Sequence, residues 1–378
     1  MLRSLFACLL FAAVAVVPCL ADTPIPTAPP VDARAYILVD FQTDKVLAAK
    51  EAVARLEPAS LTKLMTAYIV FQQLNAGKLK LDESVTVSEK AWRSEGSRSF
   101  IELGKPVPVE ALVLGMIVQS GNDATIALAE RIGGAEETFV QLMNSEAQRL
   151  GMVGTHFENS SGLPSAQHYT TARDMSLLAA ALIRDFPQYY HWFSQHEFEY
   201  NGIKQQNRNG LLSSDPSVDG LKTGHTDTAG FCLVTSAQRA GMRLISVVLG
   251  STSMKARESA SAALLNYGYT FYETSLVAKG GAKLIAAEVW KAQSTPVDIG
   301  IKHDLYVTVA RGTAADIKTV IDLEPRLFAP LATDSTVGQL RVVARGQTVA
   351  TVPVHPLVSV AAGGWWRRLV DTVRLWFH

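Results

Sequence analysis

The chain has 378 residues, 48% of them hydrophobic, and a formal net charge of zero. This length is enough for a core in each of two domains, and zero net charge gives no general electrostatic reason to bind nucleic acid. The sequence has no Gly-rich phosphate loop and its 8 His show no metal-ligand spacing, so we expect no nucleic-acid partner, metal or other cofactor.

Residues 1–21 have the layout of a secretory signal peptide. A basic start is followed by an apolar run and by small residues that end at Ala21, where we expect cleavage. An uncleaved signal anchor and a lipoprotein modified at Cys19 are alternatives, but the apolar run is short for a membrane span and a Pro precedes the Cys. The signal peptide predicts export, and the Pro-rich residues 22–32 predict a linker after it.

Removal of the signal peptide leaves one Cys in the chain. Cys8 and Cys19 lie in the removed segment, and Cys232 remains in an apolar, strand-like run. An exported protein with one thiol forms no internal disulfide. We interpret Cys232 as a buried, inert thiol rather than a nucleophile.

Residues 33–272 have the pattern of an α+β domain. Strand patterns cover 34–40, 45–49, 220–223, 231–237 and 244–249, and helical patterns cover 58–75, 108–118, 122–132, 136–150, 171–184 and 255–271. Because the strands stand at both ends of a helical middle, we expect one antiparallel sheet that the first and last segments complete together, with helices on both faces.

The composition changes at about residue 273. Short alternating runs at 297–299, 305–309, 337–343 and 348–354 are separated by Gly, Pro and Asp, which predicts a small all-β domain over 273–360. Its residues suggest no chemistry, so we interpret it as a spacer or docking module.

Residues 361–378 predict an amphipathic helix. Apolar and aromatic side chains recur at helical spacing within 363–378, and Arg side chains fill the opposite face. Such a helix is typical of a segment that lies in a membrane interface, and it is too short to span the membrane. The alternative is a helix packed against the β domain.

Three short motifs occur in a fixed order: Ser60-Leu61-Thr62-Lys63, Ser120-Gly121-Asn122 and Lys222-Thr223-Gly224. Each motif alone is weak, and the argument is their conjunction on an initial helix, an interhelical loop and a strand. This kind of set is known from β-lactamases and penicillin-binding proteins.

The first motif can supply a nucleophile and its base. Residues three apart on a helix share a face, so the Lys63 amine can reach the Ser60 hydroxyl. Lys63 acts as a base only when it is neutral, which requires burial or a second cation to lower its pKa, and Lys222 is the expected cation. Ser120 offers a second hydroxyl for proton transfer, and Asn122 offers an amide to hold Lys63 and a substrate peptide bond.

With these motifs, the segments Glu57-Pro58-Ala59-Ser60, Gly210-Leu211-Leu212, Val218-Asp219-Gly220-Leu221-Lys222-Thr223-Gly224-His225-Thr226 and Asn266-Tyr267-Gly268 carry a resemblance. From about residue 33 to its end, the chain resembles a serine-type D-Ala-D-Ala carboxypeptidase, a low-molecular-mass penicillin-binding protein with an added β domain and a C-terminal membrane anchor. The resemblance implies a β-lactamase/transpeptidase-like fold, and attachment to the periplasmic face of the bacterial inner membrane through 363–378.

The resemblance also implies a role for each site residue. Ser60 would attack the penultimate D-Ala of a peptidoglycan stem pentapeptide, with β-lactams as covalent inhibitors, and Lys63 would take its proton. Ser120, assisted by Lys222, would protonate the leaving D-Ala, and the backbone N–H groups of Ser60 and His225 would bind the oxyanion. Thr223 and Arg257 would hold the D-Ala carboxylate, with Arg208 as a second cation. Gly224 would let the substrate backbone approach the strand closely. Arg257 could equally be a surface helix residue.

Three other functions share the motifs. A class A β-lactamase needs a Glu-x-x-Leu-Asn carboxylate for deacylation, and the sequence Glu158-Asn159-Ser160-Ser161-Gly162-Leu163 does not match that pattern. A DD-endopeptidase would use the same acylation site. A wall-binding scaffold with a vestigial site is disfavoured because the motif residues are intact.

Overall fold

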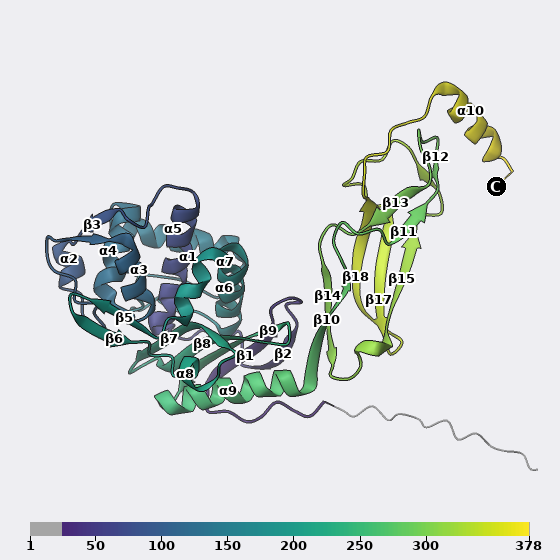
Figure 1. Cartoon of the computed structure of the whole chain (residues 1–378). Helices are drawn as coiled ribbons and strands as arrows, with labels where there is room; N and C mark the ends of the chain where they lie inside the picture. Colours follow the sequence, from purple (N-terminus) through teal and green to yellow (C-terminus); the bar gives the residue numbers. More distant parts are fainter. Residues whose placement is uncertain (1–24, 378) are drawn as a thin grey trace, which may run out of the picture.

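The computed structural model describes residues 25–377. A mixed helical and β domain stands at one end, a β domain projects from it, and a short helix lies at the far tip (Figure 1). The predicted signal peptide, residues 1–21, lies outside the described residues. Of the predicted linker, residues 25–32 run along the first domain, where Tyr267 donates to the Pro26 carbonyl at 2.9 Å and Ser251 donates to that of Asp32 at 2.6 Å.

The first domain is built on a five-stranded sheet in the order β2-β1-β9-β8-β7. All neighbouring strands are antiparallel. The strands are β1 (Ala35–Asp40), β2 (Val46–Lys50), β7 (Val218–Thr226), β8 (Gly230–Arg239) and β9 (Met242–Ser251). The predicted sheet, closed by the first and last segments of the domain, is confirmed, and it leaves β7 at an edge.

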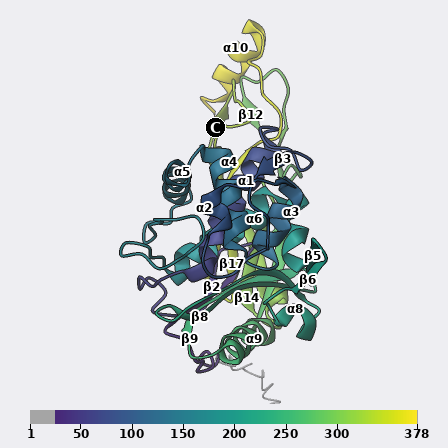
Figure 2. The same ribbon diagram turned by 90° about the vertical axis from the view of Figure 1, so that its left-hand side faces the viewer.

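Helices cover both faces of this sheet, as predicted. Helix α9 (Met254–Phe271) packs on one face of the sheet. Helix α6 (Ala172–Asp185) packs on the other face and belongs to a layer of helices there (Figures 1 and 2). The remaining long helices of that layer are α1 (Lys63–Asn75), α3 (Val109–Ile117), α4 (Asn122–Gly133) and α5 (Glu136–Arg149).

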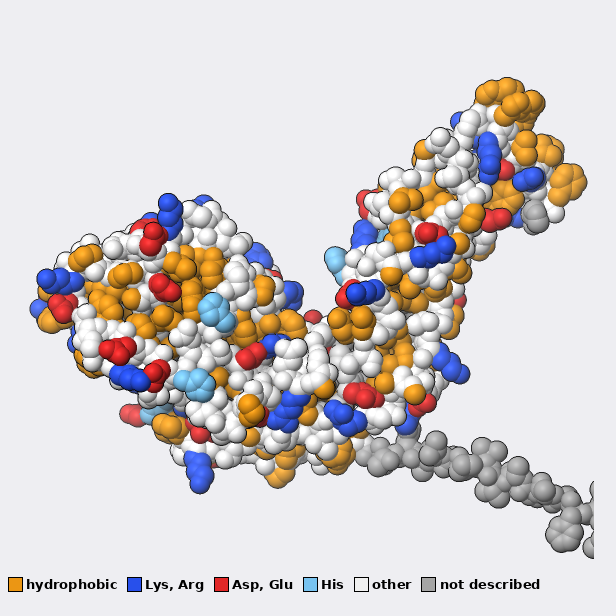
Figure 3. Space-filling view, in the orientation of Figure 1, with side chains coloured by type: hydrophobic (Ala, Val, Ile, Leu, Met, Phe, Trp, Pro, Cys, Tyr) orange, Lys and Arg blue, Asp and Glu red, His pale blue; other side chains and the backbone are white. Residues whose placement is uncertain are grey.

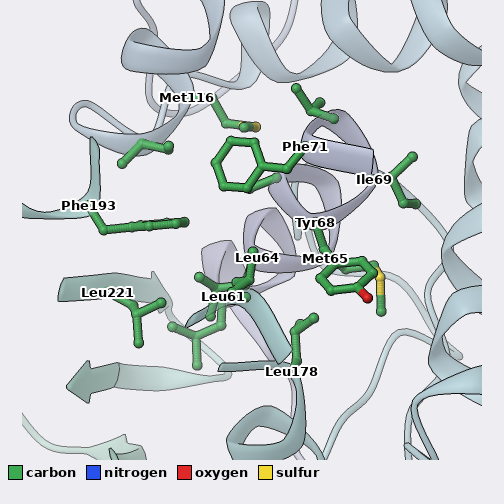
Figure 4. Close-up of a cluster of buried hydrophobic side chains, with 14 of the residues drawn as sticks. Leu61, Leu64, Met65, Tyr68, Ile69, Phe71, Met116, Leu178, Phe193 and Leu221 are labelled. Carbon is green, nitrogen blue, oxygen red and sulfur yellow. The ribbon is translucent and has the colours of Figure 1, made fainter. Parts of the chain in front are cut away.

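Helix α1 is the centre of the core. Its apolar residues are distributed around the helix, and most of them are buried, which is typical of a helix surrounded by protein. Figure 4 shows α1 side chains such as Leu64, Tyr68 and Phe71 between the sheet and the surrounding helices. Because α1 is enclosed, the residues at its first turn have a rigid support.

Several short elements were not predicted. They are β3 (Ser84–Thr86), α2 (Glu89–Trp92), β4 (Pro106–Pro108), α7 (Pro187–Tyr190), the 3₁₀ turn His191–Ser194, the hairpin β5 (Glu197–Tyr200) and β6 (Ile203–Gln206), and α8 (Leu211–Ser214). Each of them has three or four residues, too few for a periodic apolar pattern. The polar residues 201–217, for which no element was predicted, thus contain a strand and a helical turn.

The second domain is all-β, as predicted. It contains β10 (Tyr272–Ala278), β11 (Ile285–Ala287), β12 (Val289–Trp290), β13 (Val297–Gly300), β14 (Leu305–Ala310), β15 (Ile317–Leu323), β16 (Leu327–Phe328), β17 (Gly338–Ala344) and β18 (Gln347–Pro356), with a 3₁₀ turn at Ala314–Asp316. The main sheet has the order β11-β13-β18-β17-β15. This domain has apolar clusters of its own, so it does not depend on the first domain for a core.

A buried carboxylate joins the two domains. Asp40, at the end of β1, is fully buried and accepts hydrogen bonds from the hydroxyls of Thr43 at 3.0 Å and Thr274 at 2.5 Å. Thr308 of β14 lies 2.6 Å from the Thr43 hydroxyl, and its carbonyl accepts from Lys45 at 2.9 Å. These bonds hold β10 and β14 of the β domain against the sheet of the first domain.

The C-terminal helix α10 (Trp365–Arg374) contacts the β domain through its polar side. Asp371 is buried and accepts a 2.7 Å hydrogen bond from the backbone of Lys291. The apolar side chains remain exposed and gather at the tip in Figure 3: Trp365, Trp366, Leu369, Val370, Val373, Trp376 and Phe377. Packing on the β domain therefore does not bury the apolar face. Within 25–377, no helix has the length and apolar character that crossing a bilayer requires.

Candidate active site

Ser60 and Lys63 lie at the start of the central helix, as the spacing predicts. The difference is that Ala59–Thr62 form a 3₁₀ turn ahead of α1, because Ala59 has a left-handed φ of 48° that an α-helix does not accept. In this turn the Lys63 Nζ lies 3.1 Å from the Ser60 Oγ. The two groups are therefore within hydrogen-bond reach, as a nucleophile and its base must be.

Lys63 is held by two further acceptors. It is 1% exposed, and its Nζ donates to the Asn122 Oδ1 at 2.7 Å and to the Ser161 carbonyl at 2.6 Å. None of these partners is a carboxylate. Burial, and then the positive charge of Arg208, lower the pKa of Lys63 to about 7, although Asp123 acts in the opposite direction. The lowered pKa that the mechanism requires is present, but its main causes are burial and Arg208 rather than Lys222.

Lys222 is a second buried amine beside this pair. Its Nζ makes a 3.1 Å hydrogen bond to the Thr223 carbonyl. Burial, and then the charge of Lys63, hold the pKa of Lys222 well below its usual range. The positive charge of Lys63 therefore disfavours the protonated form of Lys222.

Ser120 has a strained backbone and a free hydroxyl. It stands between α3 and α4 with a left-handed φ of 66°, which is unfavourable for a residue with a Cβ. Its Oγ is buried and has no hydrogen-bond partner among the described residues. A buried hydroxyl without a partner costs free energy, so this hydroxyl is available for a bound substrate.

Seven of the ten predicted site residues line one cavity of about 380 Å³, and the other three, Lys63, Asn122 and Lys222, are buried and do not line it. Its lining is Ser60, Gly96, Ser97, Ser120, Arg208, Thr223, Gly224, His225, Phe231, Met254 and Arg257. Lys63 is connected to the cavity by its hydrogen bond to Ser60, and Asn122 is connected to it through its hydrogen bond to Lys63. No Asp or Glu is among the described residues that line this cavity, whereas two Arg are.

Arg257 lines this cavity and is not a surface residue. It is 3% exposed, and its guanidinium donates to the Gly224 and Arg208 carbonyls, both at 3.3 Å. The guanidinium also lies over the Phe231 ring, 5.7 Å from its centroid. These contacts hold a cation at the cavity without a carboxylate partner, which leaves its charge for an anionic ligand.

At Gly224, strand β7 lies close to the 3₁₀ turn Ala59–Thr62, which carries Ser60 and which we call the catalytic turn. A Cβ at this position would lie 3.0 Å from the Pro58 carbonyl and 3.1 Å from the Ser60 nitrogen, closer than side chains normally pack. The next residue, His225, has an exposed side chain whose ring lies 4.0 Å from that of Phe231. The absence of a side chain at Gly224 therefore brings the β7 backbone close to Ser60.

Sequence reasoning missed the loop beneath the catalytic turn. The Asn159 Oδ1 accepts hydrogen bonds from three successive backbone N–H groups, at residues 161–163. This turn directs the Ser161 carbonyl at Lys63 and the Ser160 carbonyl at Thr66. The Asn-x-x-Gly spacing is a turn signal, but nothing in the sequence says which side chain its carbonyls meet.

His168 was also missed. Its Nε2 lies 2.8 Å from the Thr62 Oγ1, and its Nδ1 accepts from the Glu158 backbone at 3.1 Å. Burial lowers the pKa of His168 to about 4, so the ring is neutral at neutral pH. The Glu158 side chain instead accepts from the Gln167 backbone on the surface of the loop. Neither group lines the cavity that holds Ser60, and only His168 contacts the turn that carries Ser60, through Thr62.

Gly162 should be sensitive to any added atom. It has a φ of 88°, and a Cβ there would lie 1.8 Å from the Ala59 carbonyl oxygen, an impossible contact with the residue before Ser60. We expect Gly162→Ala to cost about 2–3 kcal/mol of stability and to slow acylation of Ser60 by benzylpenicillin more than about tenfold. Thermal unfolding and acylation kinetics measure both effects.

Gly151→Ala is the matched control for this substitution. Gly151 has a similar φ of 77°, and its Cβ would meet nothing within 4 Å. It should cost about 1 kcal/mol through backbone strain alone and leave acylation unchanged. Equal effects of the two substitutions would show that the contact with Ala59 does not position Ser60.

Two other predictions concern Cys232 and metals. Cys232 on β8 is fully buried, and burial raises the pKa of its thiol to about 11, so it is protonated at neutral pH. Within the described part of the chain, no group of three or more His, Cys, Asp or Glu side chains is placed to hold a metal ion.

Comparison with known proteins covers both domains. Residues 22–253 match the family Peptidase_S11, D-alanyl-D-alanine carboxypeptidase, and residues 272–362 match the penicillin-binding protein 5, C-terminal domain. The D-alanyl-D-alanine carboxypeptidase DacA of Escherichia coli (strain K12) is 41% identical over 364 residues, which are 94% of this chain and 90% of that protein.

Solved structures agree with this match. Penicillin-binding protein 5 from Haemophilus influenzae is 38% identical, with a TM-score of 0.85 over 89% of this chain and 99% of that one. Penicillin-binding protein D2 from Listeria monocytogenes, in the ampicillin-bound form, is 31% identical, with a TM-score of 0.60 over 65% of this chain and all of that one. With the Ser-Lys pair, the partnerless Ser120 hydroxyl and the two Arg at one cavity, these matches show that the chain belongs to the peptidase S11 family of D-alanyl-D-alanine carboxypeptidases.

Proposed function

We propose that this protein removes the terminal D-Ala from peptidoglycan stem pentapeptides through an acyl-enzyme on Ser60. The observation that carries the mechanism is the Lys63 amine, which is buried, has a pKa of about 7 and lies 3.1 Å from the Ser60 Oγ. An amine with this pKa is neutral in a large part of the molecules at neutral pH, so it can accept the serine proton.

Acylation begins when the Ser60 Oγ attacks the carbonyl carbon of the penultimate D-Ala. The hydroxyl proton passes to Lys63, and the carbonyl oxygen becomes an oxyanion. The backbone N–H groups of Ser60 and His225 are the proposed donors to that oxyanion, which is supported by the close approach of β7 to the catalytic turn at Gly224. Asn122 holds Lys63 in place through its Oδ1.

The tetrahedral intermediate then expels the terminal D-Ala. The C–N bond breaks, and the departing amine takes a proton that Ser120 delivers and Lys222 helps to replace. Thr223 and Arg257 hold the D-Ala carboxylate, with Arg208 as a second cation at the cavity. Water hydrolyses the ester on Ser60 and releases the shortened peptide, which restores the serine hydroxyl.

The cavity chemistry favours a peptidase over a β-lactamase. A β-lactamase of class A requires a carboxylate to activate the water that deacylates the serine. None lines the described cavity, so a β-lactam that acylates Ser60 should remain there as a long-lived adduct. β-Lactams are therefore expected to act as covalent inhibitors.

One assay tests the proposal against its alternatives. The protein without residues 363–378 is incubated with a stem pentapeptide, with cross-linked peptide dimers and with benzylpenicillin. Release of one D-Ala per pentapeptide, together with a stable penicilloyl adduct on Ser60, is the expected result. Rapid penicillin hydrolysis without D-Ala release would support a β-lactamase, and cleavage of dimers alone would support an endopeptidase.

We also propose the location and the organisation of the chain. Residues 1–21 direct export, 33–272 form the catalytic domain, 273–360 form the spacer domain, and 361–378 attach the protein peripherally to the periplasmic face of the inner membrane. The exposed apolar side chains of α10 support the attachment. Removal of residues 363–378 should abolish co-sedimentation with liposomes, and unchanged co-sedimentation would refute it.

A further inference from the structure

A second cavity lies beside the catalytic turn, on the side of Glu57. It has a volume of about 530 Å³, and we call it the Arg34–Arg55 cavity. Its lining consists of Arg34, Arg55, Leu56, Glu57, Pro164, Ser165, Ala166, His168, Tyr169 and Thr228. Glu57 stands three residues before Ser60, and Thr228 stands four residues after Gly224, so two segments of the active site continue directly into its wall.

The cavity presents two guanidinium groups without acidic partners. The Arg34 Nη1 donates to the Thr228 carbonyl at 3.4 Å, and the Arg55 guanidinium lies over the Tyr169 ring, 4.5 Å from its centroid. Among the described residues, neither makes an ion pair with a carboxylate. Both side chains are exposed, so they are accessible to a ligand from solution.

The other ionisable groups of the wall do not neutralise these cations. The Glu57 carboxylate accepts from the hydroxyls of Thr228 at 2.5 Å and Thr226 at 3.5 Å, and so faces β7. His168 is neutral at neutral pH because burial lowers its pKa to about 4. Among the lining residues, two positive charges stand against one negative charge. The Glu158 carboxylate lies next to the wall, where it bonds to Ser165 and to the Gln167 backbone instead of to either Arg. The two Arg forks therefore remain suited to a carboxylate.

The position of the cavity fits the acyl-donor part of a substrate. In the proposed function, Arg257 and Arg208 hold the leaving D-Ala, so the rest of the peptide must extend from Ser60 in another direction. β7 is an edge strand along which an extended peptide can lie. Thr228 is four residues after Gly224, so at about 3.3 Å per extended residue the two lie at most about 13 Å apart. Three or four extended residues of a substrate peptide span that distance.

We propose that the Arg34–Arg55 cavity binds a carboxylate carried by the acyl-donor part of the stem peptide, two or three residues before the scissile bond. This inference rests on the proposed carboxypeptidase function and adds a specificity determinant to it. The recognised group is the free α-carboxylate of a γ-linked glutamyl residue or the side-chain carboxylate of a diamino acid that follows it.

Matched peptides separate these sources. One pentapeptide carries both carboxylates, and two others have one or the other replaced by a primary amide. The double variant Arg34→Gln/Arg55→Gln should lower kcat/KM for the first peptide about tenfold, mainly through KM. For the peptide that lacks the recognised carboxylate, kcat/KM with the parent protein should be lower by about the same factor. The double variant should lower it no further.

Two controls accompany the variant. Arg326→Gln/Lys318→Gln removes two exposed cations of the β domain and should change none of these rates. Acylation by benzylpenicillin, which lacks the upstream residues, should be unchanged in Arg34→Gln/Arg55→Gln.

Three results would count against the proposal. An equal loss on all three peptides would make the two Arg structural, and undiminished kcat/KM on the double carboxylate peptide would overturn the proposal directly. If the parent protein released D-Ala from none of the peptides, the proposed function itself would fail, and this inference with it.

Discussion

Lys63→Met is expected to lower the rate of Ser60 acylation by about 10³-fold at pH 8, because it removes the general base and leaves the serine hydroxyl in place. Met has a similar length and keeps the apolar packing of α1, although the Asn122 and Ser161 oxygens lose a donor. The expected loss is measured as the second-order rate constant of acylation by benzylpenicillin and as kcat/KM for a pentapeptide.

The pH profile of the parent protein is part of the same prediction. The pKa of Lys63 is lowered to about 7, so the neutral, proton-accepting form is in excess above pH 7 and in deficit below it. The acylation rate should therefore rise tenfold per pH unit below pH 7 and level off above it. In Lys63→Met, this rise with a midpoint near pH 7 should disappear.

The control for Lys63→Met is Lys78→Met, which removes an exposed Lys after the end of α1. It should leave both the rate and the pH profile unchanged. A Lys63→Met protein that folds, as judged by an unaltered thermal transition, and acylates at more than a tenth of the parent rate would refute the role of this amine.

The sequence predicted the elements that carry the motifs because those elements are long and periodic. Helix α1, the strands β7 to β9 and helix α9 have enough residues for their apolar pattern to be read, and they set where Ser60, Lys222 and Arg257 lie. The three motifs meet because the 3₁₀ turn at Ala59–Thr62 packs against β7 and α1 packs against α4, which begins at Asn122. That packing is a property of the whole core.

What the sequence could not predict are contacts made by backbone atoms and by loops. The Ser161 carbonyl that holds Lys63 has no side-chain signature, and the loop at Gly96 and Ser97 that lines the cavity has no periodic pattern. The source of the low pKa of Lys63 is a further example. Two Lys in motifs suggested mutual repulsion, but Arg208 and burial contribute more because the structure places them there.

Ser120→Ala is expected to lower kcat for a pentapeptide by about 10²- to 10³-fold, because the amine of D-Ala leaves only when it is protonated. The variant removes the buried Oγ that has no partner in the described structure, so the fold should not lose a hydrogen bond. The left-handed φ of 66° is the same strain for Ala as for Ser, and the thermal transition should shift little.

A thioester substrate distinguishes this role from a general effect on the site. When the terminal D-Ala is replaced by D-thiolactate, the leaving group is a thiolate, which departs without a proton. Ser120→Ala should then lose less than about tenfold, because attack by Ser60 is unaffected and only the protonation step was removed.

Ser99→Ala is the matched control for the hydroxyl. Its Oγ is also buried without a partner, and it lies near Gly121, but it does not line the cavity. It should change neither substrate's turnover. If Ser120→Ala slowed the amide and the thioester equally, Ser120 would act on the attack by Ser60 or on substrate binding, since a proton donor to the leaving group can matter only where that group needs a proton.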